Sequence, residues 1–263
     1  MSQVKFCRRI NIFQIIAIVS AIGNFAYITF VEYSSKGLEA FRDKAFMHDI
    51  WYPFEWERHM NVVIFLQMYY LIIGGSINVA SLTTLVVLIS YGAIKLRLLQ
   101  IKIKDIKNNS HETQVKNLLK EHQYIISFMH SLNEKTKYVM LMEFCLNSIN
   151  LAIAVMQGLM AKDLASLAYS ASLLFLVVLQ VFIIAWVSND IKIQSLAIGD
   201  AIYNCKWYDQ SRSIKDLLRL VIVRAQTPLL LTIGPFGPMT NETALTMVKA
   251  AYTYLTVMRN FYK

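Results

Sequence analysis

The sequence has little charge for its length. Asp, Glu, Lys and Arg make up 16% of its 263 residues, whereas 56% are apolar and the mean hydropathy is +0.43. Soluble domains carry about 25% charged residues, so this chain lacks the polar surface that a water-soluble fold of its size needs. We therefore predict a membrane protein.

Cysteines and the motifs of enzyme chemistry are equally scarce. Cys7, Cys145 and Cys205 are odd in number and far apart, which predicts neither a metal-binding pair nor a disulfide framework. The five histidines make no HExxH pair, and the chain has no GxxxxGK phosphate loop and no G-x-S-x-G nucleophile elbow. We expect no catalytic residue, no metal and no cofactor, and therefore no enzyme.

The net charge of +9 does not indicate nucleic-acid binding, because Lys and Arg stand in blocks between long apolar runs. The segments between the apolar runs fall into two alternating sets that differ in this charge. One set holds 18 Lys and Arg and comprises 1–9, 95–137 and 190–224; the other holds 5 and comprises 32–58 and 162–163. Cytoplasmic segments retain the excess of positive charge. We thus expect a multi-pass membrane protein with a cytosolic N-terminus and, after five crossings, a C-terminus on the outer side.

Long runs with little or no charge supply the expected crossings. A spanning helix needs about 20 apolar residues, and four such runs predict helices at 10–31, 60–94, 138–161 and 164–189. The second run is longer than one crossing requires, so its helix should tilt or project from the bilayer.

The last apolar stretch contains helix breakers. Three prolines and two glycines interrupt it, and a helix cannot pass through such a cluster intact. They are Pro228, Gly234, Pro235, Gly237 and Pro238. We predict a short cytosolic helix at 213–231, a break at 234–238 and a fifth spanning helix at 240–262.

The cytosolic segments are expected to be helical as well. Ser213 and Asp216 have capping-box spacing, which predicts a helix start at Ser213. An apolar stripe at helical spacing runs through 95–137 and needs a partner. It consists of Leu118, His122, Ile125, Met129 and Leu132. The sequence therefore predicts an all-α membrane protein with a cytosolic helical anchor bundle and a broken last helix.

The predicted final helix carries a polar stripe. Spacings of three and four place Thr246, Lys249, Thr253, Val257 and Asn260 on one face. Several copies around an axis could line a pore with this face. Burial of the helix against neighbours through its small residues is an equally good interpretation of the pattern alone.

Four motifs, in order along the chain, resemble the insect odorant receptors. W-Y-P-F-E at 51–55 is similar to the family's W-Y-P-F-D, and A-I-Y-N-C-K-W at 201–207 to its A-x-Y-x-x-x-W. P-L-L-L-T-I-G-P-F-G-P-M-T at 228–240 resembles P-L-x-I-T-A-G-K-F-x-P-L-S, and K-A-A-Y-T-Y-L-T-V-M-R at 249–259 resembles K-A-S-Y-S-Y-F-T-L-L-R. The resemblance extends over essentially the whole chain.

The resemblance implies a subunit of a ligand-gated, non-selective cation channel that forms a heterotetramer with the family's odorant co-receptor. By position, Val257 would match the hydrophobic pore constriction, and Phe261 would lie one turn further out. The family has seven spanning helices. Our first predicted helix would be the family's third, so we expect the first two to be missing from this chain.

In the family, volatile hydrophobic odorants occupy an apolar pocket in the outer half of the helices. The corresponding faces here predict three groups of ligand-binding residues. They are Ile22, Phe25 and Ala26; Phe65, Met68, Tyr69 and Ile72; and Tyr169 and Leu173. Two alternatives stay open: a gustatory-type chemoreceptor channel of the same superfamily, and a G-protein-coupled receptor or transporter.

Overall fold

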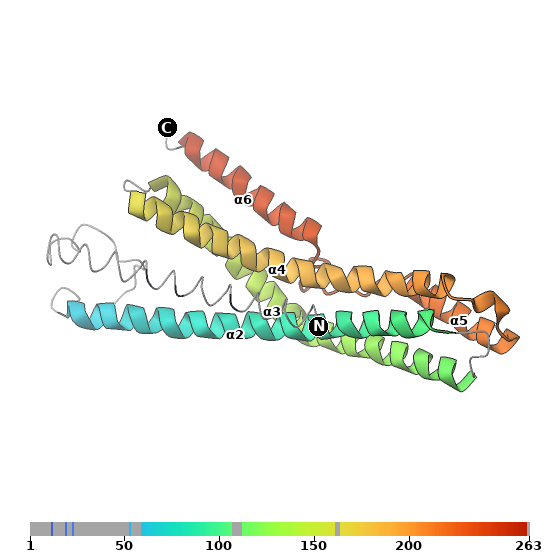
Figure 1. Cartoon of the computed structure of the whole chain (residues 1–263). Helices are drawn as coiled ribbons and strands as arrows, with labels where there is room; N and C mark the ends of the chain where they lie inside the picture. Colours follow the sequence, from blue (N-terminus) through green and yellow to red (C-terminus); the bar gives the residue numbers. More distant parts are fainter. Residues whose placement is uncertain are drawn as a thin grey trace. The chain divides into compact units, whose positions relative to one another are not determined.

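The computed structural model describes residues 59–106, 112–160 and 164–261, with Ile12, Val19, Gly23 and Pro53 as isolated positions before them. Most of the predicted first span, 10–31, therefore lies outside the described residues. The elements in chain order (Figure 1) are α2 (Met60–Lys104), α3 (Glu112–Met160), α4 (Leu164–Tyr203), the 3-10 turn η2 (Trp207–Asp209), α5 (Arg212–Ala225) and α6 (Asn241–Phe261). The described residues hold no strand, only an isolated bridge between Thr232 and Pro238, so the all-α prediction is confirmed.

Three of these helices, α2, α3 and α4, are long and apolar enough to cross a membrane. They have 45, 49 and 40 residues. At 1.5 Å per residue they are roughly 60 to 75 Å long, about twice the hydrocarbon thickness of a bilayer. The expected helix through the second half of 95–137 and the predicted span at 138–161 are thus one continuous helix, α3. α6, with Glu242 and Lys249 among its 21 residues, is not in this group.

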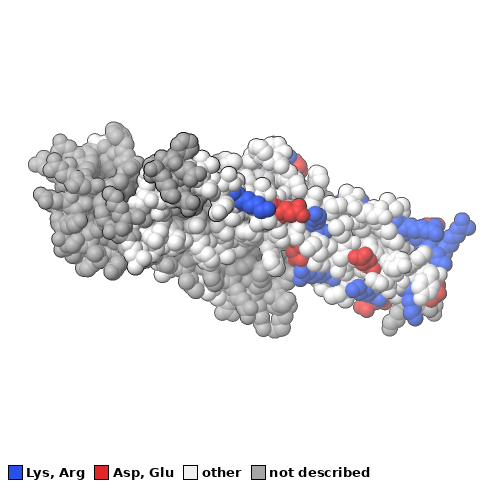
Figure 2. Space-filling view, turned by 90° about the horizontal axis from the view of Figure 1, so that it is seen from above, with Lys and Arg blue, Asp and Glu red and all other residues white. Residues whose placement is uncertain are grey.

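The chain divides into two compact units. Unit 1 comprises residues 1–84 and 153–176, and unit 2 comprises 85–152 and 177–263. The described residues of unit 1 include no Lys, Arg, Asp or Glu. The charged side chains of the described chain all belong to unit 2, and Figure 2 shows blue and red side chains crowded together on one part of its surface.

Within unit 2, α2 packs closely on α3 and α4. Gly92 of α2 lies so near Met129 and Ile191 that a Cβ there would overlap the Met129 sulfur. Further along α2, an Arg97 Nη2 group donates to both carboxylate oxygens of Asp190, at 2.8 and 2.9 Å. Gln100 donates to the backbone and side-chain oxygens of Gln194, at 2.9 and 3.1 Å. These polar contacts join α2 to α4 beside an apolar core.

The start of α5 corrects the capping prediction. Ser211, not Ser213, is the N-cap: its backbone is extended and its Oγ accepts from the Ile214 amide at 3.5 Å. The Ser213 hydroxyl instead bonds to the Glu112 carboxylate and so links α5 to α3. Bonds from Lys116 and then Ser213 lower the pKa of Glu112.

The end of α5 corrects the predicted boundary at Leu231. The helix ends at Ala225. Pro228 lacks an amide hydrogen and disfavours the helical conformation at the residue before it, so the helix cannot continue to Leu231. Within the helix, apolar residues at spacings of three and four face the interior. They are Ile214, Leu218, Val221 and Ala225.

Candidate functional site

A tight hairpin at 226–240, hereafter the hairpin, connects α5 with α6. The Ile233 amide donates to the Gly237 carbonyl and the Met239 amide to the Leu231 carbonyl, both at 2.8 Å. Gly234 and Gly237 have φ values of +51° and +119°, a region that side chains other than glycine's rarely adopt. The predicted break at 234–238 is thus confirmed, and glycine is what allows its turn.

The hairpin is held against α3 and α4. The Asn133 Oδ1 atom accepts from the Thr232 amide at 2.8 Å and from the Thr232 hydroxyl at 3.2 Å. The Gly234 amide donates to the Lys137 carbonyl at 3.0 Å, and the Leu229 amide donates to Ser195 Oγ at 3.0 Å. These bonds fix the position from which α6 departs.

The predicted pore stripe lies on one exposed side of α6. Thr246, Lys249, Thr253 and Val257 are exposed, while Ala244 and Met247 on the other side are buried. Asn260 and Phe261 belong to the same helix, but their side chains lie outside the described set. The structure therefore places the described members of the stripe on a surface that the described part of the chain leaves uncovered. Their role in a pore stays a prediction.

The predicted ligand-binding residues that the structure describes all belong to unit 1. Phe65, Tyr69 and Ile72 share an exposed face of α2, and the Phe65 and Tyr69 rings stack with their centroids 6.5 Å apart. The other described members are half-buried; these are Met68 on α2, and Tyr169 and Leu173 on α4. Ile22, Phe25 and Ala26 lie outside the described residues. The ligand pocket thus stays a prediction.

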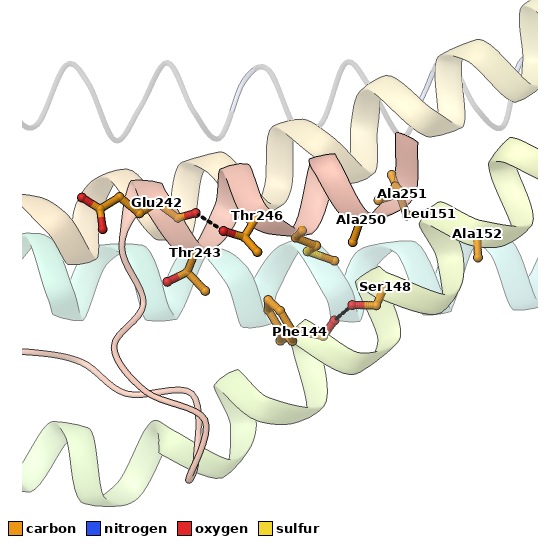
Figure 3. A pocket seen from close by; sticks show the side chains of 10 residues that line it. Phe144, Ser148, Leu151, Ala152, Glu242, Thr243, Thr246, Ala250 and Ala251 are labelled. Atoms are coloured by element: carbon orange, nitrogen blue, oxygen red, sulfur yellow. Dashed lines mark hydrogen bonds between the residues drawn. The ribbon is translucent and has the colours of Figure 1, made fainter. Parts of the chain in front are cut away.

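A groove between α3 and α6, wholly within unit 2, is a feature that the sequence did not predict. Its volume is about 630 Å³. The lining residues (Figure 3) are Phe144, Ser148, Leu151 and Ala152 of α3, and Glu242, Thr243, Thr246, Met247, Ala250 and Ala251 of α6. The lining residues of α3 follow helical spacing. This spacing could have predicted that they share one face of a helix, but not that α6 lies opposite that face.

His122 is a buried titratable group on the charged first part of α3, with 7% of its surface exposed. Burial, and then the positive charge of Arg224, lowers the pKa of His122 below 6.5. The protein therefore holds a neutral imidazole on the stripe that the sequence predicts to pack. The described residues contain no cluster of three His, Cys, Asp or Glu that could hold a metal ion.

Acidification is expected to destabilise the protein through His122. Its folded pKa is lowered, so the unfolded chain binds the proton more readily, and stability falls as the pH drops below about 6.5. His122→Gln should flatten this part of the pH profile of thermal unfolding in detergent micelles. His130→Gln, at an exposed histidine of the same helix, is the matched control. Equal slopes in wild type and His122→Gln would refute the assignment.

These features define a class: a multi-pass, all-helical membrane protein whose last helix follows a docked, glycine-dependent break. The sequence matches the family described as 7tm Odorant receptor over residues 1–252. The chain belongs to this family, whose members are receptors and not enzymes.

Individual relatives agree with this assignment. The chain is 34% identical over 149 residues to odorant receptor Or2 of Anopheles gambiae, covering 57% of this chain and 39% of that one. It is 30% identical over 179 residues to odorant receptor 10 of Aedes albopictus, covering 65% and 48%. The chain thus spans less than half the length of these two relatives.

The fold is also similar to a solved structure. The olfactory receptor OR5 of the insect Machilis hrabei, determined in complex with eugenol, superposes with a TM-score of 0.86. The match covers 99% of this chain and 68% of that one, at 16% sequence identity. At this identity the likeness concerns the fold.

Proposed function

We propose that the chain acts as an odorant receptor subunit of a ligand-gated, non-selective cation channel in the plasma membrane. Family membership supports the receptor class, and the receptor OR5 of similar fold was determined with the small aromatic molecule eugenol bound. Small hydrophobic odorants suit the predicted ligand residues, because apolar and aromatic walls bind by shape and dispersion. The partner in this proposal is an odorant co-receptor, with which the chain forms a heterotetramer.

The observation that carries the channel proposal is the exposed stripe on α6. A charged side chain that faces lipid inside the bilayer is costly, yet Thr246, Lys249 and Thr253 all lie on the uncovered side of α6, so this side needs a water-filled path. The threonine hydroxyls donate to their own helix, Thr246 to Glu242 at 2.9 Å and Thr253 to Lys249 at 3.0 Å. Their oxygens are left as acceptors, which suits passing cations. Several α6 helices around an axis would enclose a path of this kind.

The proposed topology follows from the same elements. The charged first part of α3 and the amphipathic α5 stay in the cytosol with the ends of α2 and α4 as an anchor bundle. The N-terminus is cytosolic, spans lie at about 10–31, 60–94, 138–161, 164–189 and 240–262, and α6 ends outside the cell. A C-terminal tag should therefore bind antibody on intact cells, whereas a G-protein-coupled receptor places its C-terminus inside.

The test is odorant-evoked current from cells that express this chain together with the co-receptor. Lys249→Gln should raise the unitary cation current roughly twofold, because a positive charge beside the path repels cations. Lys249→Arg keeps the charge and should leave the current unchanged. If the unitary current is identical in the two variants, Lys249 does not line the cation path. Failure to assemble and to respond to a broad odorant panel would overturn the proposal, whereas current without the co-receptor would favour a gustatory-type channel.

A further inference from the structure

The groove between α3 and α6 offers hydrogen-bond acceptors, and none of its lining side chains has a free polar hydrogen. Ser148 donates its hydroxyl proton to the Phe144 carbonyl at 2.8 Å, and Thr246 donates to the Glu242 carbonyl at 2.9 Å (Figure 3). The third hydroxyl, that of Thr243, donates to the Pro238 carbonyl at 2.9 Å. The lone pairs of Ser148 and Thr246 remain as acceptors.

The charge of the groove is confined to one residue. Glu242, in the first turn of α6, is the only ionisable residue in its lining. In Figure 3 its carboxylate points away from the apolar residues, so the negative charge lies at the rim. Apart from the three hydroxyls, the remaining surface is apolar, from Leu151, Ala152 and Met247 among others. The groove thus joins an apolar interior to an anionic edge.

We propose that this groove is a binding site for amphiphilic amines, molecules with an apolar chain and a protonated amino group. An ammonium group has three donors and no acceptor, which matches a lining of acceptors and one carboxylate. A ketone or an ester finds no side-chain donor in the groove, and a fatty acid is repelled by Glu242. The residues involved are different from the predicted odorant-binding residues, which belong to unit 1.

A consequence for channel activity rests on the proposed function. Thr246 belongs both to the groove lining and to the exposed stripe of α6. An amine in the groove therefore contacts the helix that is proposed to line the pore. We expect amines to change the size of odorant-evoked currents without themselves being the odorant.

Binding is tested on the purified full chain in detergent micelles, apart from any current. The probes are photoreactive diazirine analogues of octylamine, octanol and octanoate, which share one tail and differ in the head group. Mass spectrometry of labelled peptides should place the amine probe on 144–152 and 242–251, with octylamine competing. Labelling should decrease from amine to alcohol to carboxylate.

Variants separate the contribution of the charge from that of the cavity. Glu242→Gln should weaken octylamine competition about threefold, the size expected of an exposed ion pair. Glu134→Gln, at an exposed carboxylate of α3 outside the groove, is its control. Ala152→Phe fills the groove and should weaken competition roughly tenfold or more, since a rigid ring takes the place of the tail. Ala168→Phe, at an exposed alanine of α4, should have no effect.

Two results would overturn the proposal. Equal labelling by octanoate would show that the groove accepts any acyl chain, as a lipid-filled gap would. Labelling that Ala152→Phe leaves unchanged would place the amine elsewhere. If the label and variants behave as expected while odorants evoke no current, only the channel proposal fails.

Discussion

Replacement of Gly234 by valine is expected to lower the free energy of unfolding by about 2–5 kcal/mol. The φ of +51° costs a β-branched residue about 1–2 kcal/mol. A Cβ at this position would also lie 3.0 Å from Leu141 Cδ2, and overpacking of this kind typically costs a further 1–3 kcal/mol. Thermal unfolding of the purified chain in micelles measures the loss.

Two further variants identify the cause of that loss. Asparagine tolerates the left-handed conformation, so Gly234→Asn should cost clearly less than Gly234→Val. Gly199→Ala lies within α4, where the added methyl meets nothing closer than 3.9 Å, and it should be neutral or slightly stabilising. If Gly234→Asn and Gly234→Val were equally destabilising, the backbone conformation would not be the reason.

Loss of the Asn133 acceptor is expected to destabilise the protein by about 1–3 kcal/mol. Asn133→Leu removes the one oxygen that accepts from both the Thr232 amide and the Thr232 hydroxyl. A partly buried amide without an acceptor costs about this much. Asn133→Asp keeps the acceptor oxygen and should retain most of the stability. An aspartate variant as unstable as the leucine variant would show that these two bonds do not hold the hairpin.

The two positions should also be coupled. Both Gly234 and Asn133 act on the attachment of the hairpin to α3, so the double variant should lose less stability than the two single losses added together. If the two losses simply add, the contacts at Gly234 and at Asn133 form independently of each other. The same variants, expressed with the co-receptor, would show whether the attachment is needed for odorant-evoked current.

The elements of the fold were predictable because their signals are local. Uncharged runs predict the long helices. Pro228, Gly234 and Pro238 predict the break without any knowledge of tertiary contacts. The errors have local causes too. Two serines stand two residues apart at the start of α5. The capping-box spacing to Asp216 predicts a cap at Ser213, whereas Ser211 has the extended backbone of an N-cap. Pro228 ends the helix several residues earlier than its apolar pattern suggests.

The site was less predictable, because it is made by contacts between distant residues. Asn133 and Thr232 are 99 residues apart, and neither belongs to a motif that predicts the other. The groove likewise joins residues near 148 on α3 to residues near 246 on α6. The spacing of each set indicates that its members share one face of a helix, but it does not indicate which helix packs opposite. The predicted ligand residues came from family resemblance and still need a direct binding test.

The continuity of α3 gives the hairpin and the groove a common mechanical support. One unbroken helix carries Asn133, which holds the hairpin, and Ser148, which lines the groove. An α-helix resists bending over this distance. A rotation of α3 about its axis would therefore move the hairpin contact at Asn133 and the groove lining at Ser148 together. The turn at Gly237, where an added Cβ would meet nothing within 4 Å, lies between this support and the start of α6.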